Sequence, residues 1–204
     1  MYCMNYKFVV GVDEVGRGPV AGPVYVCSAK IAIQDIDEIL KGTTLPLRDS
    51  KKLTERMRNK WFEYLDGLRK QGKFDYKISS AKSHEIDKSG IAVCISECVT
   101  DSLSRLISSE DRKDTLVLLD GGLKAPVAYA QQTIIKGDEN EASIAFASVM
   151  AKVLRDTYMK ELHSEFPHYG FDAHKGYGTA KHMDAIRTHG PCEQHRLSFL
   201  RSVL

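Results

Sequence analysis

The sequence predicts an α/β protein in which a central mixed β-sheet is flanked by helices on both faces. Two apolar, β-branched runs stand close together near the N-terminus with a glycine-rich turn between them, which is typical of an antiparallel hairpin. Further along, short apolar runs alternate with stretches of helical spacing, which is the pattern of a mixed sheet with helical connections. The 204 residues contain no internal repeat, low-complexity stretch or linker, so we expect a single domain over residues 1–204.

The first half of the chain supplies the hairpin, an edge strand and several helices. Leu53, Met57, Trp61, Leu65 and Leu68 have helical spacing, and polar and apolar residues alternate in the stretch that predicts the edge strand. The expected elements are strands over 6–12 and 24–33, an irregular or helical connection over 35–46, a helix that Asp49 and Ser50 could cap and that ends at Gly72, an edge strand over 74–79, and helices over 83–87 and 91–106.

The second half alternates buried runs with helices. An apolar run over 115–119 predicts a fully buried strand that ends at Asp120, and a similar run over 133–136 ends at Gly137 and Asp138. The stretch over 141–166 is rich in Ala and Met, so we expect a helix that packs across the sheet. Glycines and prolines beyond it predict a loop-rich helical segment over about 170–204, with one helix over 180–189.

The clearest functional signal is an acidic pair at the end of the first apolar run. Asp13 and Glu14 follow directly after this run, where charged side chains are rarely buried without a partner. Gly16, Arg17 and Gly18 come next and combine accessible backbone with one guanidinium suited to phosphate or sugar oxygens. Carboxylates for a cation beside groups for an anionic polymer indicate a metal-dependent phosphodiester site.

Two simpler interpretations of the glycine-rich stretch compete with this one. The stretch can be an ordinary turn between two strands. It also matches a loose dinucleotide-binding fingerprint at Gly16, Gly18 and Ala21, but that fingerprint must open a helix. Pro19 and Pro23 bracket the segment and a second strand follows, so the dinucleotide interpretation is excluded by its context.

Three aspartates stand where predicted strands end, namely Asp13, Asp120 and Asp138. Side chains at the carboxyl ends of strands gather at one edge of an α/β sheet, so we expect these carboxylates to meet. Oxygen ligands select a hard ion such as Mg²⁺ or Mn²⁺, and two such ions about 4 Å apart clamp the oxygens of an in-line displacement. The alternatives remain that Asp120 starts a turn and that Asp138 belongs to a capping box with Glu141.

The composition sets weaker limits. The net charge is +2, but residues 48–60 hold six Lys or Arg against two acids, which is either a solvated helix face or a phosphate-contacting surface. Five cysteines form no C-x-x-C pair, and the chain shows neither a leader nor an apolar run of membrane-spanning length. We therefore expect a reduced, cytoplasmic protein that does not enter a membrane.

The residues from Asp13 to Gly18 match the D-E-x-G-R-G motif of the type 2 ribonucleases H, and the chain most closely resembles ribonuclease HII. Further segments of this family recur in order through most of the chain: 49–54 (DSKKLT), 118–121 (LLDG), 135–138 (IKGD), 147–153 (ASVMAKV), 174–179 (HKGYGT) and 195–199 (HRLSF). An ordered series is far more specific than any one of these short motifs.

The resemblance implies a ribonuclease H-like fold, in which the first strand pairs with the second and lies beside the fourth. It implies a metal-dependent endonuclease that cleaves the RNA strand of RNA/DNA hybrids and incises DNA 5′ to embedded ribonucleotides, leaving 5′-phosphate and 3′-hydroxyl ends. The implied ligands of the two Mg²⁺ or Mn²⁺ ions are Asp13, Glu14 and Asp120, with Asp138 as the fourth acidic residue and Asp156 as its rival.

The resemblance also implies substrate contacts. The backbone of Gly16, Arg17 and Gly18, with Tyr177, would read the junction after a ribonucleotide, and three residues would contact backbone phosphates: Ser50, Lys51 and Lys52. Four residues either frame the cleft or have packing roles: His174, Lys175, His195 and Arg196. The expected partners are RNA/DNA hybrid and ribonucleotide-containing duplex DNA, and the expected state is a monomer. The rivals are a ribonuclease HIII-like nuclease that cuts only hybrids and a catalytically silent nucleic-acid-binding module.

Overall fold

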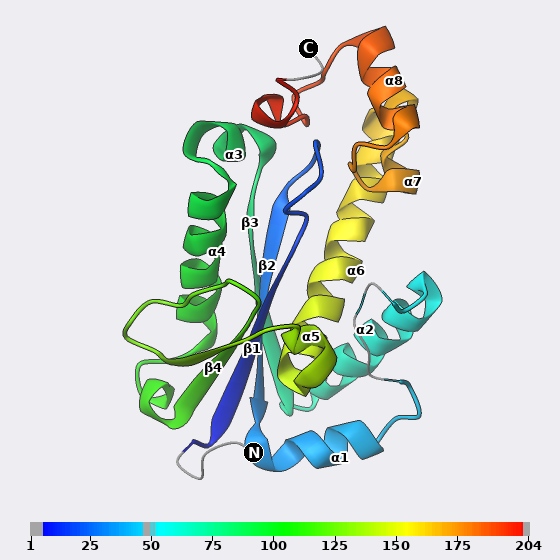
Figure 1. Ribbon diagram of the computed structural model, residues 1–204. Helices are drawn as coiled ribbons and strands as arrows, with labels where there is room; N and C mark the ends of the chain where they lie inside the picture. Colours follow the sequence, from blue (N-terminus) through cyan, green and yellow to red (C-terminus); the bar gives the residue numbers. More distant parts are fainter. Residues whose placement is uncertain (1–5, 47–49, 51, 202–204) are drawn as a thin grey trace.

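The computed structural model describes residues 6–46, 50 and 52–201, and within them the centre of the molecule is a five-stranded mixed sheet. Its strands lie in the order β3-β2-β1-β4-β5. The central strand β1 lies beside β2 and β4 (Figure 1). β1 pairs with β2 in antiparallel and with β4 in parallel register, as the resemblance implied. The strand bounds are β1 (Phe8–Val15), β2 (Val24–Ala32), β3 (Phe74–Ala81), β4 (Thr115–Asp120) and β5 (Ala130–Ile134).

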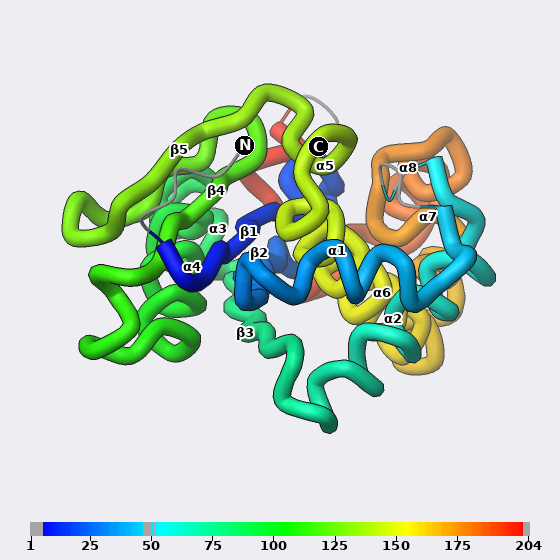
Figure 2. Tube along the Cα trace, turned by 90° about the horizontal axis from the view of Figure 1, so that it is seen from below, coloured from blue at the N-terminus to red at the C-terminus, as the bar shows by residue number. Residues whose placement is uncertain are grey.

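Helices cover both faces of this sheet. Seen from below, β1 and β2 lie between α3 and α4 on one side and α2 and α6 on the other (Figure 2). The helix bounds are α1 (Ile36–Lys41), α2 (Glu55–Lys70), α3 (Ser83–Ser89), α4 (Ile91–Leu106), α5 (Gly137–Asn140), α6 (Ala142–Glu165), α7 (Phe171–His174) and α8 (Ala180–His189). Short 3₁₀ turns lie at 33–35, 111–114, 167–169 and 197–199. The predicted fold class is therefore confirmed.

The two hydrophobic cores follow from the alternation of side chains along β1. Val9 packs into the core shared with α2 and α6, whereas Val10 and Val12 pack into the core shared with α4, since successive strand residues point to opposite faces. Gly11 stands where the N-terminal turn of α6 crosses the strand. A Cβ at Gly11 would lie 2.0 Å from the carbonyl carbon of Ser143, so only glycine allows this close approach.

Two predictions about elements were wrong. The run over 133–136 is not a third buried strand, because β5 ends at Ile134 on the sheet edge and Ile135 is 81% exposed. The helix over 55–70 is not capped by Ser50, since the hydroxyl of Thr54 accepts from the backbone N–H of Met57 at 3.3 Å, and Asp49 lies outside the described residues. The predicted crossing helix and the helix over 180–189 are confirmed as α6 and α8.

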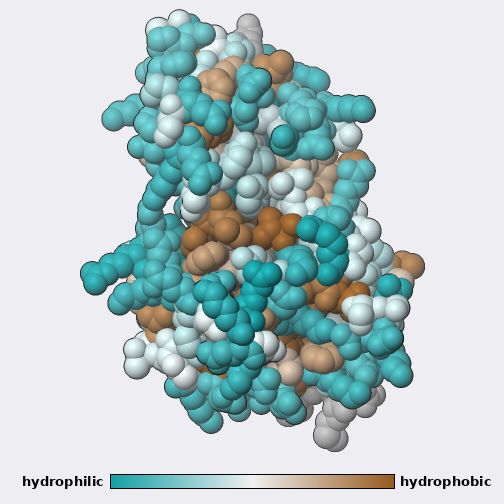
Figure 3. All heavy atoms as spheres, turned by 180° about the vertical axis from the view of Figure 1, so that it is seen from behind, coloured by the Kyte–Doolittle hydropathy of each residue, from teal (hydrophilic) through white to brown (hydrophobic). Residues whose placement is uncertain are grey.

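The surface carries mostly polar side chains on the face seen from behind, with hydrophobic ones gathered in a hollow near its middle (Figure 3). Among the described residues, no helix is both long enough and apolar enough to cross a membrane. The cytoplasmic location and the monomeric state stay predictions.

Candidate active site

Asp13 and Asp120 lie on neighbouring parallel strands, one residue beyond the register pair Val12 and Leu119. Asp13 is only 6% exposed, and its burial raises the pKa of its carboxyl to about 8. The nearby carboxylates of Glu14 and Asp120 act in the same direction, because like charges disfavour ionisation. The sheet therefore brings these three predicted residues into one electrostatic cluster.

Two serine hydroxyl groups connect Asp13 to the segment before α2. Ser148 on α6 hydrogen-bonds the Asp13 carboxyl and thereby favours its charged form. The Ser148 hydroxyl also lies 2.8 Å from the hydroxyl of Ser50, which is only 2% exposed. Ser50 therefore links the segment before α2 to Ser148, which in turn contacts Asp13. Lys51 falls outside the described residues, and the exposed Lys52 pairs with Glu139 at 2.8 Å.

Asp138 does not lie at the end of a strand, as predicted, but in the short helix α5 that begins beside Asp120. Oδ1 of Asp120 accepts from the backbone N–H of Gly137 at 2.7 Å, which fixes the start of the short helix α5 beside β4. Lys136, with φ of 55°, makes the sharp entry into that helix. Asp138 is the next residue of α5 and is 7% exposed. A hydrogen bond therefore links the neighbourhood of Asp138 to Asp120.

Asp156, the rival for the fourth acidic position, is engaged elsewhere. Its Oδ1 accepts from Nζ of Lys152 at 2.8 Å, and its Oδ2 lies 3.6 Å from a guanidinium nitrogen of Arg58. Burial lowers the pKa of Lys152, and the Asp156 carboxylate opposes that effect. Lys152 and Arg58 therefore already compensate the charge of Asp156.

The carboxylate oxygens of the predicted ligands are chemically suited to a hard divalent cation. Across residues 6–46, 50 and 52–201, no three His, Cys, Asp or Glu side chains are already close enough to enclose an ion. Asp13 is nevertheless a buried carboxyl whose ionisation is opposed by burial and by Glu14 and Asp120. A bound cation would relieve both effects, and oxygen-only donors suit Mg²⁺ or Mn²⁺.

The loop after β1 is held by Arg155, a fully buried side chain of α6. Gly16 has φ of 88°, and a Cβ there would lie 2.2 Å from Nε of Arg155, so this position accepts only glycine. Arg155 donates to the carbonyl oxygens of Pro23 at 2.8 Å, Lys175 at 3.0 Å and Ala21 at 3.3 Å. One guanidinium thus ties the glycine-rich loop to the C-terminal segment.

Arg196 holds the same loop from its other side and is also fully buried. It donates to the carbonyl oxygens of Gly16 at 2.7 Å and Arg17 at 3.0 Å, and it makes two bonds to that of Gly22. Burial lowers the pKa of Arg196 to about 9, so the group remains charged at neutral pH. Of the two roles left open by the sequence, packing against this loop is the one observed.

Tyr177 lies beside the glycine-rich loop, as predicted. The carbonyl oxygen of Gly176 accepts from the backbone N–H groups of Val20 and Ala21, which joins the two segments. A Cβ at Gly18 would lie 3.9 Å from Cε1 of Tyr177, and the Tyr177 side chain is 44% exposed. A half-exposed phenol next to bare backbone is available to a ligand that covers this loop.

Buried histidines fix the backbone of Tyr177. The N–H of Cys192 donates to Nδ1 of His195 at 2.9 Å, so the other ring nitrogen of neutral His195 carries its proton. That nitrogen lies 3.1 Å from Nε2 of His182, whose Nδ1 then donates to the Tyr177 carbonyl oxygen at 2.9 Å. His174 stacks on His182 with ring centroids 4.2 Å apart. Burial lowers the pKa of His182 to about 4, which keeps this chain neutral.

Comparison with known proteins assigns the family. The sequence profile described as Ribonuclease HII matches residues 10–202. The chain belongs to the ribonuclease HII family. A ribonuclease HII of Clostridium perfringens is 42% identical over 200 residues, covering 98% of this chain and 69% of that protein. One from Caldicellulosiruptor bescii is 40% identical and covers 98% of this chain and 90% of its own length. This family membership makes the chain a ribonuclease H-type endonuclease and hydrolase.

Solved structures confirm the fold of this ribonuclease HII family member. The ribonuclease H2 from Pyrococcus horikoshii OT3 aligns with a TM-score of 0.73 and 21% identity over 96% of both chains. Bst-RNase HIII, solved in complex with Mn²⁺, aligns with a TM-score of 0.72 and 16% identity over 96% of this chain and 68% of that one.

The sequence pattern gave no role to two residues of α6 that contact the site. Ser148 and Arg155 lie seven residues apart, which places both on one face of the helix. The family-like segment over 147–153 contains Ser148, but only the hydrogen bond to Asp13 identifies its partner. No signal in the sequence alone distinguishes Arg155 from an ordinary surface arginine.

Proposed function

We propose that this chain is a metal-dependent endonuclease that hydrolyses the RNA strand of RNA/DNA hybrids and incises duplex DNA 5′ to embedded ribonucleotides. The products would carry 5′-phosphate and 3′-hydroxyl ends. Residues 1–204 would act as one domain, with the segment over about 170–204 contacting substrate. The observation that supports this proposal most is the buried Asp13 carboxyl, whose pKa is raised to about 8 beside Glu14 and Asp120.

Asp13, Glu14, Asp120 and Asp138 would hold two Mg²⁺ or Mn²⁺ ions. When bound, such ions supply Lewis acidity to activate a water and to neutralise the departing 3′ oxygen. The chain must keep Asp13 ionised for this purpose, and the Ser148 hydroxyl favours the charged form. The Gly137 N–H orients Asp120 by occupying one of its oxygens at 2.7 Å.

The backbone from Gly16 to Gly18, together with Tyr177, would recognise the junction between a ribonucleotide and the deoxynucleotide after it. The 2′-hydroxyl is the group that separates RNA from DNA, and a rigid backbone can discriminate it only if its position is fixed. Arg155 and Arg196 provide that rigidity through their bonds to carbonyl oxygens in and near the loop. The exposed Arg17, together with Lys51 and Lys52, suits phosphate contacts that position the duplex.

Two alternative functions make different predictions. A ribonuclease HIII-like nuclease would have the same fold, because the TM-scores to the two types are almost equal at 0.73 and 0.72. The sequence identity of 42% to a ribonuclease HII favours the HII type. A silent binding module would have no need for the four acidic residues, and all of them are present.

The test uses three duplexes of equal length in Mg²⁺ or Mn²⁺: DNA with a single ribonucleotide, a full RNA/DNA hybrid, and plain DNA. We expect cleavage on the 5′ side of the single ribonucleotide and within the hybrid, and none in plain DNA. Cleavage of the hybrid alone would support the HIII type, and binding without cleavage would support the silent module. The matched control is Asp13→Asn, which should bind the duplexes and leave them intact.

A further inference from the structure

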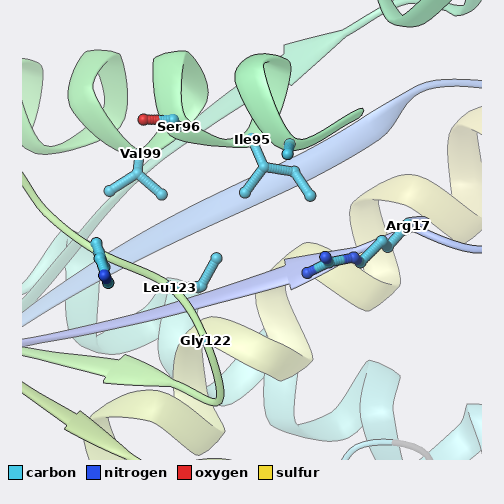
Figure 4. A pocket seen from close by; sticks show the side chains of 8 residues that line it. Arg17, Ile95, Ser96, Val99, Gly122 and Leu123 are labelled. Carbon is cyan, nitrogen blue, oxygen red and sulfur yellow. The ribbon is translucent and has the colours of Figure 1, made fainter. Parts of the chain in front are cut away.

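A pocket of about 230 Å³ lies between α4 and the loop that follows β4. Ile95 and Val99 point from α4 toward the loop with Gly122 and Leu123, and Arg17 reaches in from the end of β1 (Figure 4). Ile95, Val99 and Leu123 are at most 5% exposed, so the floor of the pocket is apolar and fixed. Exposed residues form its rim: Arg17, Ala92, Ser96, Gly122 and Lys124.

The pocket adjoins the carboxylate cluster. Arg17 follows Glu14 by three residues, and a guanidinium nitrogen lies 3.7 Å from Oε1 of Glu14. Lys124 follows Asp120 by four residues, and the intervening turn is fixed by a bond from the N–H of Leu123 to the Asp120 carbonyl oxygen at 3.1 Å. The Arg17 guanidinium is therefore held next to Glu14, and the backbone that carries Lys124 is tied to that of Asp120.

The pocket and Tyr177 belong to opposite sides of the sheet. The pocket is built on α4, which shares its core with Val10 and Val12 of β1. The neighbour of Tyr177, Gly176, packs near Met159 of α6, and α6 covers the other face. If a duplex binds over the carboxylates, its two strands lie on different sides of this cluster. If Tyr177 contacts the cleaved strand, as proposed above, the other strand extends toward α4.

The chemistry of the pocket fits the backbone of DNA better than that of RNA. Two exposed cations at the rim suit a phosphate, which contributes affinity without reading sequence. The small apolar surface that Ile95 and Leu123 expose at the floor suits the methylene of a deoxyribose. A ribose would bury its 2′-hydroxyl against these side chains, and an unpaired buried hydroxyl is unfavourable.

We propose that this pocket is the binding site for one sugar-phosphate unit of the uncleaved, complementary DNA strand, and that it disfavours a ribonucleotide in that strand. The site adds a second point of substrate recognition to the junction contact at Tyr177. This inference rests on the proposed nuclease function, and the tests below separate the two.

The first test measures Lys124→Ala against Lys113→Ala. Lys113 is also an exposed lysine, but it precedes β4 and so lies at the opposite end of that strand from Asp120. For Lys124→Ala we expect KM for a hybrid duplex to rise about tenfold with kcat unchanged, and the slope of log affinity against log salt to become less steep by about 0.9. Lys113→Ala should match the wild type. An unchanged salt slope for Lys124→Ala would overturn the proposal.

The second test identifies the strand. Single ribonucleotides are placed, one position at a time, in the complementary strand of a hybrid whose cleaved strand is labelled. We expect KM to rise when the ribonucleotide occupies one position close to the cut. This rise should be smaller for Lys124→Ala, because the phosphate next to that sugar is then no longer held in the pocket. A flat profile in the wild type would overturn the assignment to a deoxyribose of the complementary strand.

A third variant, Ala92→Glu, places a negative charge at the rim in the first turn of α4, where an acidic side chain stabilises the helix. It should weaken duplex binding while the thermal midpoint stays equal to or above that of the wild type, and unchanged binding would count against the site. Failure of the wild type to cut any duplex would instead overturn the proposed function. If the wild type cuts normally and the Lys124→Ala and Ala92→Glu variants bind and cut the duplexes as it does, only this inference is overturned.

Discussion

Arg196 donates a hydrogen bond of 2.7 Å to the carbonyl oxygen of Gly16, across 180 residues of sequence. The same guanidinium reaches the carbonyl oxygens of Arg17 and Gly22. Because one planar guanidinium group donates to three carbonyl oxygens, the conformation of the glycine-rich loop depends on the C-terminal segment. A change at Arg196 should therefore reach the active site without touching any metal ligand.

Arg196→Lys tests this dependence. A lysine is a compact charge that cannot serve several carbonyl groups in a plane, and each buried carbonyl oxygen left unpaired costs about 1–3 kcal/mol. We expect the urea midpoint to fall and kcat/KM on a single-ribonucleotide duplex to fall at least about tenfold, which corresponds to 1.4 kcal/mol in the barrier. The exposed Arg201→Lys is the matched control. Equal midpoints for both variants would mean that the bonds of Arg196 do not stabilise the fold.

Gly16→Ala should be more damaging to stability than Gly18→Ala. A Cβ at Gly16 meets Nε of Arg155 at 2.2 Å in a backbone with φ of 88°, whereas at Gly18 the nearest atom is 3.9 Å away. Strain and displacement of a buried arginine predict a loss of about 2 kcal/mol or more at Gly16, whereas the change at Gly18 should stay within about 0.5 kcal/mol of zero. Urea unfolding of the two variants measures the difference. Equal losses would show that Arg155 moves aside without cost.

Asp13→Asn should stabilise the metal-free protein while it abolishes activity. The folded pKa of Asp13 is about 8 against an ordinary 3.8, so its contribution to stability is present below 3.8 and is lost as the pH rises toward 8. Asparagine has no such loss, so in EDTA the advantage of the variant should grow between pH 5 and pH 8. Activity should fall by more than about 100-fold, because a charged oxygen ligand is lost. Added Mn²⁺ should raise the thermal midpoint of the wild type more than that of the variant.

Tyr177→Phe and Tyr177→Ala separate the phenol from the ring. If the hydroxyl contacts the junction, Tyr177→Phe should lower kcat on the single-ribonucleotide duplex while Mn²⁺ binding, measured by calorimetry, stays unchanged. Tyr177→Ala should lower it further because the ring is lost as well. The side chain is 44% exposed, so both variants should fold with midpoints close to the wild type. A parallel loss of metal affinity would identify Tyr177 as part of the scaffold.

How much of this site was predictable depends on where each residue sits. The position of Asp120 at a strand end follows from pattern, because it ends an apolar run that is the buried strand β4. Asp138 does not, since the run before it is an exposed sheet edge and a short helix brings it close to Asp120. Ser148 lies in the first half of α6, where all residues over 143–151 are buried and periodicity distinguishes no face, whereas Arg155 lies in the second half, which has exposed positions. Their orientation follows from tertiary contacts, namely the crossing of α6 over Gly11 and the bonds of Arg155 to the loop after β1.

The histidines behind Tyr177 predict a loss of stability in mild acid. The pKa of His182 is lowered from 6.5 to about 4, chiefly by burial, and those of His174 and His195 are lowered for the same reason. Between pH 6.5 and 4 the unfolded chain binds protons that the folded chain refuses, so these groups stabilise the fold above pH 6.5 and lose that effect as the pH falls. Protonated His182 would also be unable to accept from His195.

His182→Gln isolates this effect. The raised pKa of Asp13 acts in the opposite direction over part of the same range, but it is common to both proteins and cancels in their difference. The free energy of unfolding of the wild type, relative to His182→Gln, should fall by up to about 1.4 kcal/mol per pH unit below pH 6.5. His84→Gln, at an exposed position of α3, is the control and should leave the wild-type profile unchanged. Parallel profiles for the wild type and His182→Gln would mean that His182 takes up its proton without unfolding, and the neutral chain from Cys192 to Tyr177 would then be wrong.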